Sequence, residues 1–111
     1  MLSDHAGNLM NIEVLNLDVN NITALCPSVR NWTKLKTLTI SDNSLTGLPL
    51  EASSWEEIQI LNLKNNKIAD MGTLPQFWPR LERLFLGLNL LAGIPFEIGT
   101  CTHLIELDLS Q

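Results

Sequence analysis

The sequence lacks long apolar runs and an export signal, and each absence excludes a class of protein. No apolar run approaches the roughly 18 residues that a membrane-spanning helix needs. The N-terminal segment MLSDHAGNLMN has neither the basic start nor the apolar stretch of a signal peptide. We therefore expect a soluble chain that stays in the cytoplasm and has no membrane as a partner.

Basic residues are also scarce. Seven Lys and Arg stand against twelve Asp and Glu, which gives a net charge of −5, and no basic stripe is interleaved with aromatic residues. Nucleic-acid binding needs such a surface to neutralise phosphates. A protein is thus the expected partner, and a hydrophobic content of 45% over 111 residues favours one globular domain over a disordered chain.

Catalytic and metal-binding motifs are missing as well. The sequence has no P-loop, no GxGxxG and no CxxC, and His5 and His103 lie near opposite ends. Catalysis needs a nucleophile, a base and an orienting group within hydrogen-bond reach, or a cluster of metal ligands. We predict no enzymatic activity, no metal and no cofactor.

What the sequence does have is a period of 23 residues. The repeats begin at Ile12, Leu35, Ile58, Leu81 and Leu104. They align the segments IEVLNLDVNNI, LKTLTISDNSL, IQILNLKNNKI, LERLFLGLNLL and the truncated LIELDLSQ. Each complete segment follows L-x-x-L-x-L-x-x-N-x-L, with Ile at some of the leucine positions. A fixed period of this length decides the architecture before any local structure is considered.

This pattern resembles that of the leucine-rich repeat family, in which it recurs roughly every 20–29 residues. The resemblance covers the whole chain. A second apolar column holds Leu25, Leu48, Met71 and Ile94, followed in two repeats by Pro49 and Pro95. The period and this second half are most similar to the intracellular, scaffold-type repeats of Ras-pathway regulators. The resemblance implies an α/β solenoid, a right-handed superhelix with a concave parallel β-sheet.

The alternation L-x-L within each segment predicts a short strand, because successive side chains of a strand point to opposite faces. We expect parallel strands that begin near residues 13, 36, 59, 82 and 105. A repeated asparagine follows each of the first four predicted strands, at Asn20, Asn43, Asn66 and Asn89. An Asn amide both donates and accepts, so all four are expected to be buried and hydrogen-bonded to backbone as a ladder.

A further column lies three residues before each repeat start and holds Leu9, Trp32, Trp55, Trp78 and Cys101. We expect the tryptophans to cap the leucine core as large apolar fillers on the convex side. The two cysteines, Cys26 and Cys101, occupy different columns about three repeats apart. That separation is about 14 Å for strands stacked about 4.8 Å apart, beyond the ~7 Å limit of a disulfide, so both should be free and buried.

The repeat phase also marks the chain ends. Leu2 lies one period before Leu25, and residues 2–11 are predicted to be the tail of an upstream repeat. We interpret residues 1–111 as a leucine-rich repeat segment of a longer array, with repeats starting at 12, 35, 58, 81 and 104. Terminal leucines should be less buried than central ones, and self-association through uncapped solenoid ends is expected. A short chain capped by self-association is the alternative.

Two N-x-[ST] tripeptides start at Asn21 and Asn31. Their middle residues, Ile22 and Trp32, belong to core columns, and nothing else in the sequence supports secretion. We do not predict glycosylation at either position.

The third, fifth and seventh positions of each repeat should face outward on the concave side. Phe85 is a fifth-position residue between Leu84 and Leu86, so strand alternation leaves its ring outside. Together with Ile60, Leu88 and Leu90 it should form an apolar patch with a charged border, the pattern of an interface. The candidate protein-binding residues are Thr39, Ile60, Asn62, Lys64, Arg83, Phe85, Leu88 and Asp108.

The predicted function is a non-enzymatic protein–protein interaction module in an intracellular signalling or scaffold protein. Two alternatives stay open. The chain could be the recognition or regulatory region of a larger enzyme such as a kinase, GTPase or ligase. It could also be part of a receptor ectodomain, which would require a signal peptide upstream.

Overall fold

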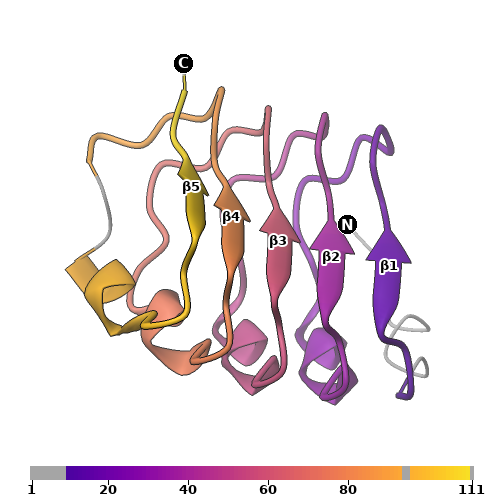
Figure 1. Ribbon diagram of the computed structural model, residues 1–111. Helices are drawn as coiled ribbons and strands as arrows, with labels where there is room; N and C mark the ends of the chain where they lie inside the picture. Colours follow the sequence, from indigo (N-terminus) through magenta and orange to yellow (C-terminus); the bar gives the residue numbers. More distant parts are fainter. Residues whose placement is uncertain (1–9, 94–95, 111) are drawn as a thin grey trace.

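The computed structural model describes residues 10–93 and 96–110, which form one open parallel sheet (Figure 1). Its strands are β1 (Val14–Asn16), β2 (Thr37–Thr39), β3 (Ile60–Asn62), β4 (Arg83–Phe85) and β5 (Glu106–Asp108). They follow one another in chain order, and every pair is in a register of 23 residues, as in Leu38↔Leu61. The predicted parallel strands are confirmed, each beginning one residue after the expected position.

The return path behind the sheet is made of short 3-10 helices (Figure 1). These are η2 (Pro27–Asn31), η3 (Leu50–Ser54), η4 (Leu74–Phe77) and η5 (Phe96–Thr100). A 3-10 helix rises about 2.0 Å per residue and covers the return distance with fewer residues than an α-helix. The helical part of the predicted α/β solenoid is therefore built from 3-10 turns, and prolines at the start of η2 and η4 suit that geometry.

The leucine columns form the core between the sheet and these helices. The central residues Leu38, Leu61 and Leu84 are completely buried. Residues in the same columns of the outer repeats are only partly buried: Ile12, Leu15, Leu17, Leu104, Leu107 and Leu109. The expected gradient of burial is confirmed for these residues, while self-association through them stays a prediction. The predictions for Leu2, His5, Leu9, Ile94 and Pro95 lie outside the described residues.

The tryptophan column does more than fill space. Trp32, Trp55 and Trp78 are completely buried, and their rings stack at centroid distances of 6.1 and 6.4 Å with interplanar angles of 13°. The indole N–H of Trp55 donates to the Val29 carbonyl at 3.0 Å, as that of Trp78 does to Ala52. Trp55 and Trp78 thus each donate to a backbone carbonyl of the preceding repeat, a role that the sequence analysis did not predict.

Cys101 continues the tryptophan column with a thiol in place of an indole. Its Sγ donates to the Pro75 carbonyl at 3.4 Å, the equivalent acceptor one repeat further on. Burial raises the pKa of this thiol above its ordinary value, against a smaller opposing effect of the Thr100 hydroxyl. Both cysteines are buried thiols, as predicted.

The Asn ladder is present, but its first member is not buried. Asn66 donates from Nδ2 to the carbonyls of Ile40 and Leu63 at 2.8 and 3.0 Å, and its Oδ1 accepts from the Leu45 N–H at 3.0 Å. Asn89 repeats the arrangement, and both side chains are buried.

Burial of the ladder residues falls off toward β1. Asn43 makes the same bonds but is half-buried, and Asn20 is exposed. The side chain of Asn20 donates to the Asp18 carbonyl at 3.0 Å. The prediction that all four are buried is therefore wrong for Asn20 and too strong for Asn43. The physical reason is that at least half of the side-chain partners of Asn43, Asn66 and Asn89 come from the preceding repeat, and no complete repeat before Asn20 is described.

The residue just before each ladder Asn adopts a left-handed conformation. Val19, Asp42, Asn65 and Leu88 have φ angles of 56–57°. Asp and Asn tolerate this region, whereas a β-branched or bulky apolar residue is strained there. Val19 and Leu88 are nevertheless apolar, and both are exposed, by 73% and 46%.

A candidate protein-binding face

The strand register arranges the outward side chains in rows on the side of the sheet turned away from the core, here called the concave face. One row is Val14, Thr37, Ile60, Arg83 and Glu106, and the next is Asn16, Thr39, Asn62, Phe85 and Asp108. Six of the eight candidate residues lie in these two rows. The structure therefore brings the predicted strand residues together on one surface.

The side of this face near β1 is acidic and polar. The Asp18 carboxylate accepts hydrogen bonds from the Thr39 hydroxyl and the Ser41 N–H, both at 2.7 Å. Partial burial alone would raise the pKa of Asp18, but the hydrogen bonds from Thr39 and Ser41 outweigh it and lower the pKa below its ordinary value. The Thr39 hydroxyl is thus bonded to Asp18 and the side chain is half-buried, so less of its surface is available to a partner than the sequence suggested.

Phe85 lies in β4 between Asn62 of β3 and Asp108 of β5. Both neighbours are fixed, because Asn62 Oδ1 accepts from the Lys64 N–H at 3.0 Å and Asp108 Oδ1 from the Ser110 N–H at 2.9 Å. The ring is half-buried. It therefore presents an apolar surface between two rigid polar walls, with Ile60 in the diagonal position on β3.

The next outward position along the chain, just after β4, is Gly87. A Cβ at this position would lie 2.8 Å from both the carbonyl oxygen and the Oγ of Ser110, so the close approach of Ser110 requires glycine. Lys64, Gly87 and Ser110 share one repeat position, and Asp108 lies in the row of Phe85. Hydrogen bonds from the Ser110 backbone and hydroxyl, helped by Lys64, lower the pKa of Asp108.

Leu88 and Leu90 lie at the rim where β4 ends. Leu88 donates its N–H to the Ser110 carbonyl at 2.7 Å, and Leu90 to the Ile68 carbonyl at 2.9 Å. The backbone is thereby fixed while the side chains stay 46% and 64% exposed. Lys64 and Lys67 of the preceding repeat are also exposed, and Arg83 makes an ion pair with Glu106 at 3.8 Å.

Comparison with known proteins decides the family. A model of the leucine-rich repeat matches residues 10–68, more than half of the chain. The chain belongs to the leucine-rich repeat family. The intracellular Ras-pathway subtype stays a prediction.

Solved leucine-rich repeat structures superpose closely on the chain. A leucine-rich repeat protein of Leptospira interrogans gives a TM-score of 0.89 at 31% identity, over 98% of this chain and 28% of the other. An internalin of Listeria monocytogenes gives 0.86 at 27% identity, over 98% and 32%. The chain thus spans about a third or less of these two proteins. No curated protein sequence matches it.

A plant peptide hormone receptor, RGFR1 in complex with RGF2, gives a TM-score of 0.88 at 24% identity, over 99% of this chain and 18% of the receptor. At that identity the likeness shows the fold alone. It confirms that this leucine-rich repeat segment forms a solenoid, as the repeat pattern predicted.

Neither a candidate metal site nor a helix able to span a membrane is found among the described residues. Residues 10–93 and 96–110 contain no cluster of three or more His, Cys, Asp or Glu side chains placed to hold a metal ion. In the same ranges, no helix of this leucine-rich repeat chain has the length and apolar character to cross a membrane.

One exposed apolar residue of this surface is not among the candidate binding residues. Val14 heads the row that contains Ile60 and is exposed. Its third-position place in the repeat predicted that it faces outward. Strands β2 and β3 separate it from Phe85 of β4, so it lies apart from the candidate site.

Proposed function

We propose that the chain is a non-enzymatic module that binds a protein partner through the concave face. The contact is centred on a repeat-four patch, defined as Ile60, Phe85, Leu88 and Leu90. Its border is charged and consists of Lys64, Lys67, Arg83 and Asp108. Membership of the family supports a protein-binding role in general, and the exposed patch supports the proposed location of the contact.

One observation carries the proposal. Phe85 stands in a column whose other members are all polar: Asn16, Thr39, Asn62 and Asp108. Leu90 likewise stands where the other repeats have Asn21, Ser44 and Lys67. The fold therefore does not need apolar side chains at these positions. Phe85 and Leu90, the two apolar residues at otherwise polar positions, lie in the same repeat, and the exposed and strained Leu88 lies between them.

The physical case for binding follows from exposure and composition. Contiguous exposed apolar residues with a charged border mark an interface more often than scattered ones. An aromatic anchor with an arginine close by is the composition favoured at energetic centres of interfaces. The basic side chains Lys64 and Lys67 favour a partner that presents acidic groups around an apolar contact.

We further propose that this module works inside the cell, in the cytoplasm, as part of a signalling or scaffold protein. The burial of Cys26 and Cys101 as thiols in different repeats supports a reducing compartment. A second candidate, the recognition region of a larger multidomain protein, is favoured by the small share of each solved relative that the chain spans. In that case any enzymatic activity would lie outside these 111 residues.

Phe85→Ala tests the patch directly. We expect the variant to bind its partner more weakly by about 2 kcal/mol or more, which corresponds to a roughly thirty-fold rise in Kd, because truncation removes the anchor. Its melting temperature should change little, since the ring is half-buried and polar residues occupy its column in other repeats. The partner is first captured from extract of cells that express the protein, then purified, and its Kd is measured by calorimetry.

Two comparison variants make the result interpretable. Arg83→Glu should also weaken binding without unfolding the chain, because Arg83 is exposed. Leu84→Ala removes a completely buried side chain and should instead destabilise the fold by about 2–5 kcal/mol. Unfolding of Phe85→Ala would make the ring structural, and an unchanged Kd would place the partner elsewhere.

A further inference from the structure

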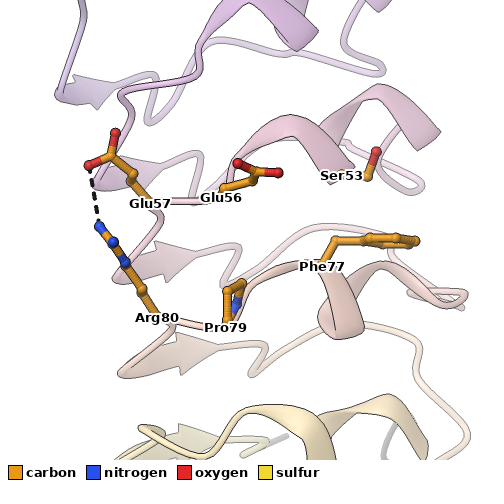
Figure 2. Close-up of a pocket in the computed structure, with 6 residues that line it drawn as sticks. All are labelled: Ser53, Glu56, Glu57, Phe77, Pro79 and Arg80. Carbon is orange, nitrogen blue, oxygen red and sulfur yellow. Dashed lines mark hydrogen bonds and ion pairs between the residues drawn. The ribbon is translucent and has the colours of Figure 1, made fainter.

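A second surface feature lies on the opposite side from the repeat-four patch, between two consecutive repeats. An open depression of about 650 Å³ is lined by Ser53, Glu56, Glu57, Phe77, Pro79 and Arg80. Figure 2 shows the first three contributed by η3 and the turn after it, and the other three by the equivalent segment of the next repeat. None of them takes part in the concave face.

The helix on one side of the depression, η4, departs from the repeat period. The helices η2, η3 and η5 begin at residues 27, 50 and 96, which are multiples of 23 apart, whereas η4 begins at residue 74 instead of 73 and is one residue shorter. The depression therefore lies beside the one described 3-10 helix that is out of phase with the others.

The residues on the η4 side also break the sequence pattern. Phe77 stands in a column with Asn31, Ser54 and Thr100, and Pro79 in one with Thr33, Glu56 and Thr102. Phe77 is 44% exposed, although its neighbour Trp78 is completely buried. An exposed aromatic ring beside a proline therefore provides one wall that the fold itself does not require.

The wall on the η3 side of the depression carries two carboxylates, Glu56 and Glu57. Arg80 Nη1 lies 3.5 Å from Glu57 Oε1, so these two opposite charges are paired with each other (Figure 2). Glu56 is exposed, and its carboxylate lies on the η3 side, facing the wall that carries Phe77 (Figure 2). Because one of the two carboxylates is matched by Arg80, the lining keeps one net negative charge, and it belongs to Glu56.

We propose that this depression receives an arginine side chain of a partner protein. A guanidinium is planar, so it can stack on the Phe77 ring while its N–H groups donate to the Glu56 carboxylate. An aromatic wall with one unmatched carboxylate complements that group in both shape and charge. The site would thus give the chain a second contact point, independent of the concave face and of the function proposed for it.

The test uses small probes and the full chain. N-acetyl-arginine amide is titrated at low ionic strength while the backbone and aromatic signals are followed by nuclear magnetic resonance. We expect saturable shifts centred on Ser53, Glu56 and Phe77. The citrulline analogue has nearly the same shape without the charge, and it should bind at least about five-fold more weakly. The lysine analogue should also bind more weakly, because it cannot stack in the same way.

Matched variants separate the site from general electrostatics. Glu56→Gln should weaken arginine binding about five-fold, and Phe77→Ser should abolish the saturable shifts. Glu51→Gln removes the same charge from η3 outside the depression and should leave binding unchanged. The spectrum of each free variant reports whether the fold is retained. Equal binding of arginine and citrulline or lysine, equal effects of the two Gln variants, or no saturable shift would overturn the proposal.

Discussion

Replacing Asn66 by alanine should lower the free energy of unfolding by about 3–5 kcal/mol. The amide satisfies the Leu45 N–H and the carbonyls of Ile40 and Leu63, all at 2.8–3.0 Å in a buried place. The Leu45 N–H would be left without this partner, at about 1–3 kcal/mol, and the two carbonyls, which also accept from Asn43 and Asn89, would each lose one hydrogen bond worth about 0.5–1.5 kcal/mol. Because two of the three groups belong to the preceding repeat, the loss should also weaken the contact between neighbouring repeats.

Asn20→Ala is the matched control, because it removes the same side chain from the same column. Asn20 is exposed, and its side chain makes one bond, to the Asp18 carbonyl. Its replacement should cost less than about 1 kcal/mol. Urea denaturation followed by circular dichroism measures both variants. Equal losses would show that the ladder does not stabilise the stack through bonds between repeats.

Trp55→Ala should have an effect of similar size, about 3–5 kcal/mol, since it opens a cavity at a completely buried ring. The side chain stacks between Trp32 and Trp78 and also donates to the Val29 carbonyl. A loss of this size is a large part of the total stability of a small domain. We expect thermal melts to show a variant that is largely unfolded at moderate temperature.

Trp55→Phe divides that effect into its parts. Phenylalanine keeps an aromatic ring in the stack but removes one of the two donors to the Val29 carbonyl, which still accepts from the Trp32 N–H, so the loss should be about 0.5–1.5 kcal/mol. Phe77→Ser, at an exposed aromatic residue nearby, should change stability by less than about 0.5 kcal/mol. If Trp55→Phe were as stable as the parent chain, the hydrogen bond would contribute nothing and the column would act by packing alone.

The sheet could be predicted from the sequence because its register is written in the repeat. Leu15, Leu38, Leu61, Leu84 and Leu107 are 23 residues apart, and the strands pair these same residues. A parallel sheet with one buried face cannot slip by one residue without turning its leucines to water. The period therefore determined fold, strand order and core together.

The return path was less predictable, because no periodic apolar pattern specifies a 3-10 helix of four or five residues. The one-residue delay of η4 follows no repeat position, although Phe77 in an otherwise polar column was a usable signal. Hydrogen bonds of the tryptophan N–H groups were equally hidden, since their acceptors lie 26 residues earlier, in the preceding repeat. Such contacts depend on stacking geometry that a linear pattern does not contain.

The candidate site could be predicted in part. Strand alternation correctly placed Ile60, Arg83 and Phe85 on one face, but it could not tell that Thr39 is held by Asp18. Nor could it reveal the left-handed backbone at Leu88, because that conformation is set by the turn, and only two of the four described repeats have Asp or Asn there. Leu88 shares this conformation with Val19, but only Leu88 is followed two residues later by an exposed leucine, Leu90, and that pairing is the sign from which we propose that this rim contributes to binding.

That sign gives the most direct measurement of the central claim. Leu88→Asn and Val19→Asn each remove an exposed apolar side chain from a left-handed position and replace it by a residue that tolerates the conformation. Both should melt at the same or a higher temperature than the parent chain. The Kd for the captured partner, measured by calorimetry, should rise about ten-fold or more for Leu88→Asn and stay unchanged for Val19→Asn. An unchanged Kd for Leu88→Asn, or an equal rise in both variants, would contradict a binding surface centred on the repeat-four patch.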